Sequence, residues 1–281
     1  MKLIDWNPIG FLERQFNFDS QCWKSEIRNF EVKEHPGLFV KRLDWDSSFF
    51  NSEIFKIIFI KNNFNFDISS QFFSEGNFSK EPAHLFLEIP SEAVQLFKPL
   101  MKCGFSLVES RLTYYHSLEE FPSKNNSARP ATKLDVPFLK KVASLAINDF
   151  DRYHADDFFS KFDADRYLET YIENCVNGFA DIVFVPNLET NPASFVAVSK
   201  LNETGWLEEG PLFRIPLTAC LPENKGWHYN LCVGALHYAK ENKSKCLIMT
   251  TQATNKAVIH NCEKMGFKLG SSFHIFSKSF Y

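Results

Sequence analysis

The chain lacks two features that mark disulfide-bonded, zinc-binding or membrane-spanning proteins: paired cysteines and long apolar runs. Its seven Cys include no Cys-x-x-Cys pair and are odd in number, so we expect reduced thiols rather than a disulfide framework or a structural zinc site. No apolar run is long enough to span a bilayer, and residues 1–8 have no secretory apolar core. These absences predict a cytoplasmic protein that binds no membrane.

An excess of positive charge is also lacking. The 31 Lys and Arg against 34 Asp and Glu make a net charge of −3, which argues against a general nucleic-acid or anionic-membrane binder. The eight His show no zinc-protease or zinc-finger spacing, so no metal site is predicted. What the chain has is 281 residues, 44% of them hydrophobic, with 31 Phe, which suffices for two modest domains with aromatic-rich cores.

The most informative stretch covers residues 250–267. The apolar run at 246–249 predicts a buried strand before it, and the polar residues that follow open a helix that Thr254 or Asn255 can cap. Gly266 stands where a helix C-terminus favours the left-handed conformation, and the next strand begins directly after it. The helix directs its apolar residues to one face: Ala257, Val258, Cys262 and Met265.

Residues 101–107 (MKCGFSL) echo residues 263–269 (EKMGFKL), and each carries a Gly-Phe pair before an aromatic-rich strand. This self-similarity indicates two related βα units, one in each half of the chain. Residues 121–130 are rich in Pro, Asn and Ser, and they predict a linker between an N-terminal domain at 1–120 and a C-terminal domain at 131–281.

Hydrophobic periodicity predicts an α/β protein with a mixed sheet of the α+β type rather than a doubly wound sheet. Predicted strands lie at 54–60, 84–89, 112–116, 181–185, 194–201 and 273–276, with one long strand or a hairpin at 206–221. Predicted helices lie at 69–78, 91–101, 138–147, 165–176 and 227–241, with Ser91 and Asp135 as caps. Residues 43–50 are predicted as a turn with buried aromatic side chains, and residues 149–162 as a loop or a broken helix.

A second informative stretch is the turn between the strand that ends near Leu221 and the helix that begins near Trp227. Such a turn directs free backbone N–H groups and the positive end of the helix dipole at whatever lies above it, which suits a pyrophosphate. Gly226 lets the backbone approach the anion, and Lys225 adds positive charge. The alternative is an ordinary strand–turn–helix with a Gly in the turn.

Together these stretches resemble the GNAT family of acyl-CoA N-acyltransferases, which carries Arg/Gln-x-x-Gly-x-Gly/Ala at this turn and an Asn and a Gly-Phe around the last helix. His228 or Tyr229 stands where the motif has its second small residue. The resemblance implies a GNAT fold in the C-terminal domain, a smaller, degenerate GNAT-like N-terminal domain, and acetyl-CoA as co-substrate. It assigns these residues to the coenzyme: Leu217, Ala219, Leu221, Lys225, Gly226, Trp227, His228, Tyr229, Asn230, Gln252, Asn255 and Cys262.

Several segments also resemble the dTDP-fucosamine acetyltransferase group, whose members acetylate the amine of a nucleotide-linked 4-amino-4,6-dideoxy sugar. Besides residues 166–174 and 251–255, they are residues 43–50 (LDWDSSFF), 104–109 (GFSLVE) and 151–156 (DRYHAD). A guanidinium, a ring and an imidazole in the last segment suit a diphosphate and a base or sugar ring. The acceptor residues that this resemblance implies are Arg152, Tyr153, His154 and Asp156. The alternative is a surface loop with Tyr153 packed inward.

The implied chemistry is direct attack of a neutral amine on the thioester, without a covalent enzyme intermediate. In the resembled group a Tyr on the last helix protonates the leaving thiolate, and Cys262 stands at that position here. The alternative interpretation of Cys262 is a small core residue, with Tyr229 as the substitute acid. Glu208 or Glu209 can act as the base, unless the two form a solvated hairpin pair.

Two other functions stay open at this point. One is the same transfer to a peptide or a small-molecule amine. The other is a catalytically silent acyl-CoA-binding protein, which the absence of a Tyr at position 262 motivates. The sequence also leaves a homodimer open.

Overall fold

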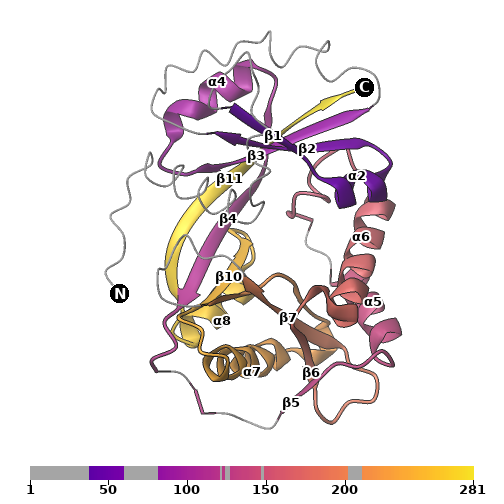
Figure 1. Ribbon diagram of the computed structural model, residues 1–281, viewed down its shortest axis with the longest axis vertical. Helices are drawn as coiled ribbons and strands as arrows, with labels where there is room; N and C mark the ends of the chain where they lie inside the picture. Colours follow the sequence, from indigo (N-terminus) through magenta and orange to yellow (C-terminus); the bar gives the residue numbers. More distant parts are fainter. Residues whose placement is uncertain (1–37, 60–81, 121, 124–126, 147–148, 202–210) are drawn as a thin grey trace. The chain divides into compact units, whose positions relative to one another are not determined.

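A computed structural model describes residues 38–59, 82–120, 122–123, 127–146, 149–201 and 211–281 (Figure 1). The chain divides into two compact units, and neither is continuous in the sequence. Unit 1 comprises Met1–Arg111, Phe150–Phe159 and Ser272–Tyr281, and unit 2 comprises Leu112–Asp149 and Ser160–Ser271. This division differs from two contiguous domains, because the chain re-enters unit 1 twice. The helix expected at 69–78 lies outside the described residues, as do Glu208 and Glu209.

The helices and strands are labelled in Figure 1. Unit 1 contains β1 (Leu38–Arg42), α2 (Asp44–Phe50), β2 (Glu53–Phe59), β3 (Ala83–Pro90), the 3-10 turn η2 (Val94–Leu96) and α4 (Phe97–Lys102). Unit 2 contains β5 (Ala128–Pro130), α5 (Val136–Leu145), α6 (Lys161–Asn174), the π turn η3 (Cys175–Phe179), β6 (Ile182–Pro186), β7 (Ser194–Leu201), β8 (Leu212–Ile215), β9 (Thr218–Cys220), the 3-10 turn η4 (Pro222–Asn224), α7 (Trp227–Glu241), β10 (Leu247–Gln252) and α8 (Lys256–Lys264). Two long strands, β4 (Ser106–His116) and β11 (Lys268–Phe280), contribute residues to both units.

Unit 1 is a sheet with the strand order β1-β2-β3-β11-β4. β2 runs parallel to β3 and antiparallel to β1, and β11 runs antiparallel to β3. Alternate side chains of β3 point to opposite faces of the sheet. Leu85, Leu87 and Ile89 are buried in one cluster with residues of α4, while Phe86 packs with Ile54 in another. Because both faces of β3 are covered, this strand is apolar along most of its length.

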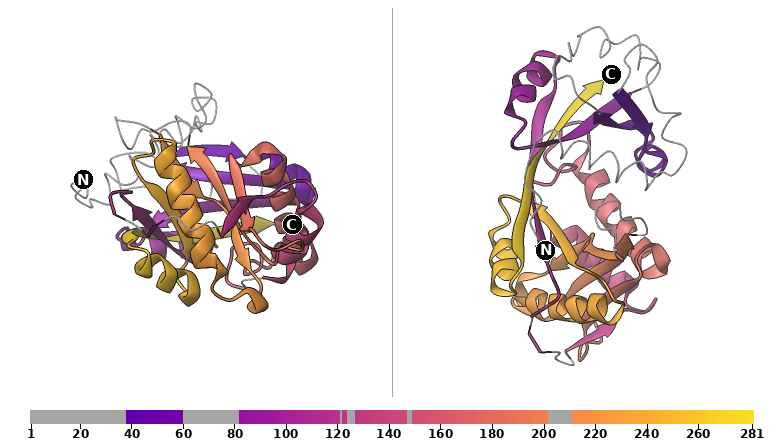
Figure 2. Two further views of the ribbon diagram at one scale, coloured as in Figure 1. Left: turned by 90° about the horizontal axis from the view of Figure 1, so that it is seen from below. Right: turned by 60° about the vertical axis from the view of Figure 1, so that its left-hand side comes forward.

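Unit 2 is a mixed sheet with the order β4-β10-β8-β7-β6-β5, and β11 lies on the other side of β4. β10 runs parallel to β8, whereas β5, β6, β7 and β8 pair antiparallel. Helices cover both faces: Val183, Val185 and Phe195 cluster with α5 and α6, while Phe184 and Val196 cluster with α7. Figures 1 and 2 show α7 lying along one face of these strands. The predicted α/β fold with a mixed sheet is confirmed.

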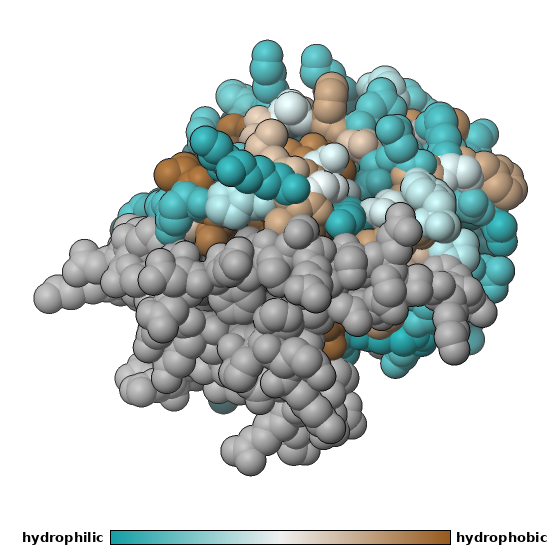
Figure 3. All heavy atoms as spheres, turned by 90° about the horizontal axis from the view of Figure 1, so that it is seen from above, coloured by the Kyte–Doolittle hydropathy of each residue, from teal (hydrophilic) through white to brown (hydrophobic). Residues whose placement is uncertain are grey.

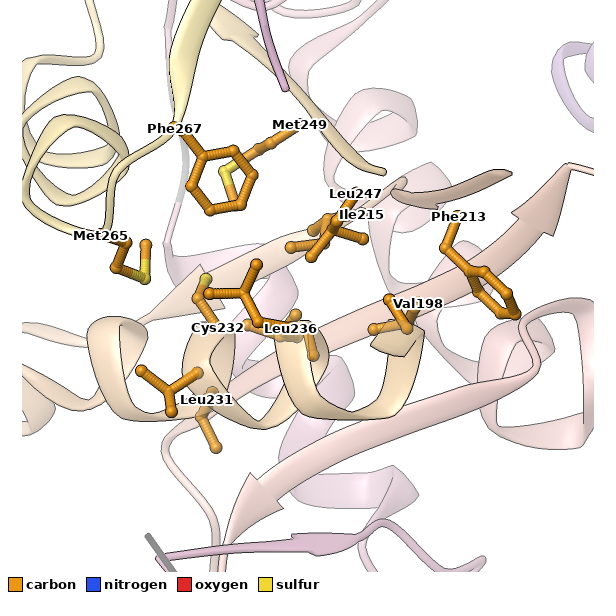
Figure 4. Packing of buried hydrophobic residues seen from close by; sticks show 14 of the residues in the cluster. Val198, Phe213, Ile215, Leu231, Cys232, Leu236, Leu247, Met249, Met265 and Phe267 are labelled. Carbon is orange, nitrogen blue, oxygen red and sulfur yellow. The ribbon is translucent and has the colours of Figure 1, made fainter. Parts of the chain in front are cut away.

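The main core of unit 2 forms where α7 lies on the sheet (Figure 4). Leu231, Cys232 and Leu236 of α7 pack with Val198 and Ile215 of the strands, and all five are buried. The helix α8 and the turn after it complete this cluster with Cys262, Met265 and Phe267. Burial of one large apolar side chain contributes about 1.5–3 kcal/mol, so this cluster holds α7 and α8 to the same strands.

The two Gly-Phe pairs adopt the same backbone geometry. Gly104 has φ +84° after α4 and Gly266 has φ +89° after α8, and each precedes a long strand. A residue with a side chain is strained in this left-handed region, so both positions favour Gly. The predicted helix end at Gly266 is confirmed. The cap at Asn255 is confirmed too, because its side chain accepts the Val258 N–H at 3.2 Å.

Two local predictions in unit 1 are wrong. Residues 44–50 form the short helix α2 rather than a turn, with Asp46 and Ser47 buried. Ser91 caps no helix, because its hydroxyl lies 3.0 Å from Nε2 of His274 and the first helical turn begins later, at Val94. Both departures come from contacts with distant segments, which override local turn and cap preferences.

Asp135 anchors the start of α5, although not as the predicted cap. Its carboxylate accepts bonds from the Arg129 guanidinium at 2.9 and 2.8 Å and from the Thr132 backbone N–H at 2.7 Å. No N–H of α5 donates to it. The Arg129 hydrogen bonds contribute most to lowering the pKa of Asp135 to about 2.

The view from above in Figure 3 shows hydrophilic residues along most of the coloured rim, with hydrophobic residues between them. A folded surface in contact with water has this mixed character. None of the helices that the structure describes combines the length and the apolar character that crossing a bilayer requires.

Asp135→Asn is expected to lower the free energy of unfolding by about 2 kcal/mol at neutral pH, because a carboxyl whose pKa is depressed in the folded state stabilises it above the unfolded pKa. This contribution is lost as the pH falls from about 5 towards about 2. Urea unfolding across this range measures it, and wild type and variant should converge at the acid end. Asp149→Asn, at an exposed position, is the control and should change stability by less than about 0.5 kcal/mol. An equal loss at every pH would contradict the ion pair.

Candidate active site

An extra residue between β8 and β9 opens the sheet of unit 2. β7 pairs with β8 through Ser199 and Arg214, and with β9 through Val196 and Thr218. Between these pairs, two residues of β7 lie opposite three residues of the neighbouring strand, which is a β-bulge. The middle residue of the three is Pro216, which has no N–H to donate to a ladder.

β10 parts from its neighbour at the same place. Its parallel register with β8 ends at Met249 opposite Ile215, although β10 continues to Gln252. Within the described part of the chain, β9 has β7 as its one strand partner. The parallel strands therefore splay where β9 begins, and one edge of β9 carries no described strand.

At the edge of β9 that faces away from β7, every second residue directs its backbone N–H and C=O groups outward. The Leu217 oxygen accepts from the Ala197 N–H at 2.9 Å, and the Leu221 N–H donates to an oxygen of the residue before β7 at 3.0 Å, so these residues face that neighbour. Since backbone groups alternate along a strand, the N–H and C=O groups of Thr218 and Cys220 point to the splayed side. An extended chain that carries amides can pair with this edge as an added strand does.

The turn that follows β9 leads into the first amides of α7. Gly226 has φ +100°, and no atom of the described residues lies within 4 Å of the position that a Cβ would take, so this side of the turn is open among them. The Asn224 side chain donates to both oxygens of Glu189 at 2.9 and 3.1 Å, which fixes the approach to the turn. Lys225 is exposed, and no described carboxylate pairs with it. The α7 amides, the helix dipole and this ammonium together favour an anion here.

His228, the second residue of α7, is buried and connects this turn to α8. Its Nδ1 lies 2.9 Å from the side-chain nitrogen of Asn261, and its Nε2 lies 3.6 Å from the Cys232 sulfur. Burial lowers the pKa of His228 to about 4, so the imidazole is neutral near pH 7. A neutral ring that accepts from Asn261 at Nδ1 carries its proton on Nε2.

Two more side chains lie at the start of α7. The Cys220 thiol donates to the Asn224 oxygen at 3.0 Å and accepts from the backbone N–H of His228, while burial raises its pKa. Tyr229 packs against the core of unit 2, and the Lys264 ammonium lies 4.8 Å from the centroid of its ring. The ring of Tyr229 is therefore held between the core of unit 2 and Lys264 of α8.

Cys262 lies in the core of unit 2. It has no exposed surface, and its sulfur lies 3.4 Å from the Met249 sulfur. Burial raises the pKa of Cys262 to about 12. A thiol in this environment packs well and gives up a proton poorly, which agrees with the interpretation as a small core residue.

The predicted acceptor residues all lie in the Phe150–Phe159 segment of unit 1. Tyr153 is buried and donates to the Asp46 carboxylate at 2.7 Å. The Arg152 guanidinium lies 4.2 Å from the centroid of the Phe86 ring, and its backbone N–H donates to Glu109 at 3.0 Å. Tyr153 is thus packed inward, as the alternative interpretation of this loop expects.

The other two acceptor residues have carboxylate–imidazole partners within unit 1. Nδ1 of His154 lies 2.6 Å from Asp151, and Nε2 of His84 lies 3.3 Å from Asp156. Burial would raise the pKa of Asp156, but the hydrogen bond and the charge of His84 outweigh it, so this pKa is lowered. Tyr153, His154 and Asp156 thus each have a polar side-chain partner within unit 1.

A small cavity lies within unit 1 beside these residues. Its volume is about 10 Å³, which is room for about one water molecule. Arg152, Asp156 and Ser277 are among the residues that line it. A sugar is far larger than this space, so these side chains as they lie form a packed network rather than an open acceptor pocket.

The predicted coenzyme residues come together in unit 2 at two places, the β9–α7 turn and the β10–α8 turn. The first place holds Leu217, Ala219, Leu221, Lys225, Gly226, Trp227, His228, Tyr229 and Asn230, and the second holds Gln252 and Asn255, whereas Cys262 lies further along α8 in the core. Sequence reasoning missed Thr218, Cys220 and Asn261. Two tertiary features identify these residues: the register of β9 on β7 and the contact between His228 and Asn261. No local sequence signal indicates either of them. Within the described ranges, no group of three or more His, Cys, Asp and Glu side chains is arranged to hold a metal ion.

No family model matches the chain, and no curated protein matches its sequence. Among solved structures it resembles a GCN5-related N-acetyltransferase from Sphaerobacter thermophilus, with a TM-score of 0.55, 8% identity, and coverage of 87% of this chain and 77% of that one. It also resembles an acetyltransferase of the GNAT family from Colwellia psychrerythraea, with a TM-score of 0.52, 13% identity, and coverage of 98% and 96%. The chain therefore has the GNAT fold, as its sequence resemblance predicted.

Cys262 is expected to resist alkylation in the folded protein, because the thiolate is the reactive species and the pKa of this thiol is about 12. Labelling with iodoacetamide near pH 8, followed by peptide mass spectrometry, should modify the half-buried Cys220 at least about tenfold faster. In denaturant the two should react alike, which controls for intrinsic differences. Native labelling of Cys262 at the rate of Cys220 would contradict its buried placement.

Proposed function

We propose that this protein is a GNAT-type N-acyltransferase that moves an acetyl group from acetyl-CoA to an amine. One observation carries the proposal: the bulge at Pro216 exposes an edge of β9 directly before the first turn of α7. A coenzyme A thioester uses both features, since its pantetheine arm contains amides and its pyrophosphate is negatively charged.

In this proposal the chain binds the coenzyme mainly with backbone groups. The N–H and C=O groups of Thr218 and Cys220 pair with the pantetheine amides. The α7 amides and Lys225 bind the pyrophosphate, and Gly226 allows it to approach. Because these contacts need backbone geometry rather than particular side chains, they tolerate the departure from the family motif at His228.

The reaction itself needs two proton transfers. The neutral amine attacks the thioester carbon, a C–N bond forms, the C–S bond breaks, and the attacking nitrogen loses a proton while the thiolate gains one. We assign the base to Glu208 or Glu209. We assign the acid to Tyr229, because the pKa of the buried Cys262 thiol is about 12. A backbone N–H of the splayed β9 edge stabilises the oxyanion.

For the acceptor we propose the amine of a nucleotide-linked amino sugar. The support is the resemblance of three segments, 43–50, 104–109 and 151–156, to the dTDP-fucosamine acetyltransferases. Since the polar groups of Arg152, Tyr153, His154 and Asp156 already have partners in unit 1, we assign these residues to holding the Phe150–Phe159 segment in shape.

A transfer assay tests both the proposed acetyl transfer and the proposed acceptor. Purified protein is mixed with acetyl-CoA and dTDP-linked amino sugars, peptides or polyamines, free thiol release is followed, and products are identified by mass. We expect release with a dTDP-linked 4-amino sugar and none with the matched sugar that carries a hydroxyl in place of the amine. Transfer only to peptides or small amines would keep the reaction and change the acceptor. Coenzyme binding without any transfer would indicate the silent acyl-CoA-binding protein, and neither binding nor transfer would end the proposal.

Lys225→Ala should raise the Kd for coenzyme A about two- to fivefold, because one exposed charge beside a phosphate contributes about 0.5–1 kcal/mol at low ionic strength. Titration calorimetry at low and high salt measures this, and the difference from wild type should shrink as salt screens the charges. Lys133→Ala, which removes an exposed Lys before α5, is the matched control and should leave the Kd unchanged. An equal effect of both variants would contradict the placement of the pyrophosphate at this turn.

A further inference from the structure

His228 presents an apparent obstacle to coenzyme binding. It stands in the first turn of α7, where the resembled motif has a small residue, yet its ring does not occupy the open side of the turn. The residue is 7% exposed, and its ring lies beside Cys232, four residues along the buried face of α7. The space beside Gly226 stays open. The bulk of the imidazole is therefore directed into the core.

Inside the core, both ring nitrogens of His228 have partners. The Asn261 side-chain nitrogen lies 2.9 Å from Nδ1, and the Cys232 sulfur lies 3.6 Å from Nε2. Asn261 belongs to α8, whose first residues follow the splayed end of β10. A partly buried hydrogen bond thus joins the first turn of α7 to α8.

The direction of this bond selects one tautomer. With the proton on Nδ1, two donors would face each other at 2.9 Å and the amide of Asn261 would lose a buried acceptor. With the proton on Nε2, Nδ1 accepts from Asn261 and Nε2–H points at a polarizable sulfur. The second arrangement satisfies every group, and it prevents the α7 turn from sliding along α8.

We propose that His228 is a positioning residue for the coenzyme. Held by Asn261 as the Nε2–H tautomer, it keeps the amides at the start of α7 aimed across the splayed strands at the pyrophosphate. This inference rests on the proposed function, and it assigns a role to His228, one of the residues at which the sequence departs from the family pattern.

A set of five variants tests the inference through coenzyme affinity. His228→Leu and Asn261→Leu should each raise the KM for acetyl-CoA roughly five- to tenfold, as expected for the loss of one buried hydrogen bond, and leave kcat within about twofold. The double variant should be no worse than either single one, because both remove the same bond. His260→Leu, an exposed His next to Asn261 on α8, is the matched control and should behave as wild type. His228→Gln, which keeps an acceptor for Asn261, should recover part of the affinity.

Two-dimensional NMR of the imidazole nitrogens gives a readout that is independent of turnover. The wild type should show His228 as the Nε2–H tautomer, and finding Nδ1–H would overturn the inference. If the wild type binds coenzyme A and the Leu variants bind it equally well, the positioning role is wrong while the proposed function stands. If the wild type fails to bind coenzyme A at all, the proposed function is wrong and the positioning role falls with it. A Leu variant that does not fold leaves the decision to His228→Gln and the tautomer.

Discussion

The arrangement of unit 2 depends on one extra residue in a strand. Between the pair Ser199–Arg214 and the pair Val196–Thr218, the ladder gains a residue on one side and loses an N–H at Pro216. The pairing of β10 with β8 ends at Met249 opposite Ile215, directly before this bulge residue. With it, the strands separate, the backbone of β9 is offered on one edge, and the chain turns directly into α7.

The strands of unit 2 can separate here because packing against a buried cluster fixes the helices around them. Leu231 and Leu236 of α7 and Met265 after α8 belong to one buried cluster with the strands. Two side chains of reactive types, a thiol and an imidazole, take part in this packing. Cys262 is a core thiol beside Met249, and the His228 ring lies beside Cys232. The fold is shared with solved structures that are 8% and 13% identical to this chain.

Unit 1 shows what burial demands of charged side chains. Asp46, Glu109 and Asp156 are buried, and each lies against a donor: the Tyr153 hydroxyl, the Arg111 guanidinium and the His84 imidazole. An unpaired charge in such a place would be strongly destabilising, so these partners are a condition of folding. The same requirement gives the Phe150–Phe159 segment a structural function before any ligand is considered.

The sequence alone determined much of unit 2. Apolar periodicity placed β7, α7 and the helix end at Gly266, and a strand–Gly–helix pattern located the turn before α7, because these features follow from contacts a few residues apart. It did not reveal that Thr218 and Cys220, rather than Leu217 or Leu221, direct backbone groups away from β7. Which residues of β9 face β7 depends on the bulge at Pro216, and the bulge is visible only in the pairing with β7. It also did not reveal that the Asn261 side chain lies against His228, or that Asp135 binds Arg129 instead of capping α5. Only the tertiary structure decides these points, since each joins groups on separate elements, and hydrogen bonding and burial select among partners that a linear pattern leaves equivalent.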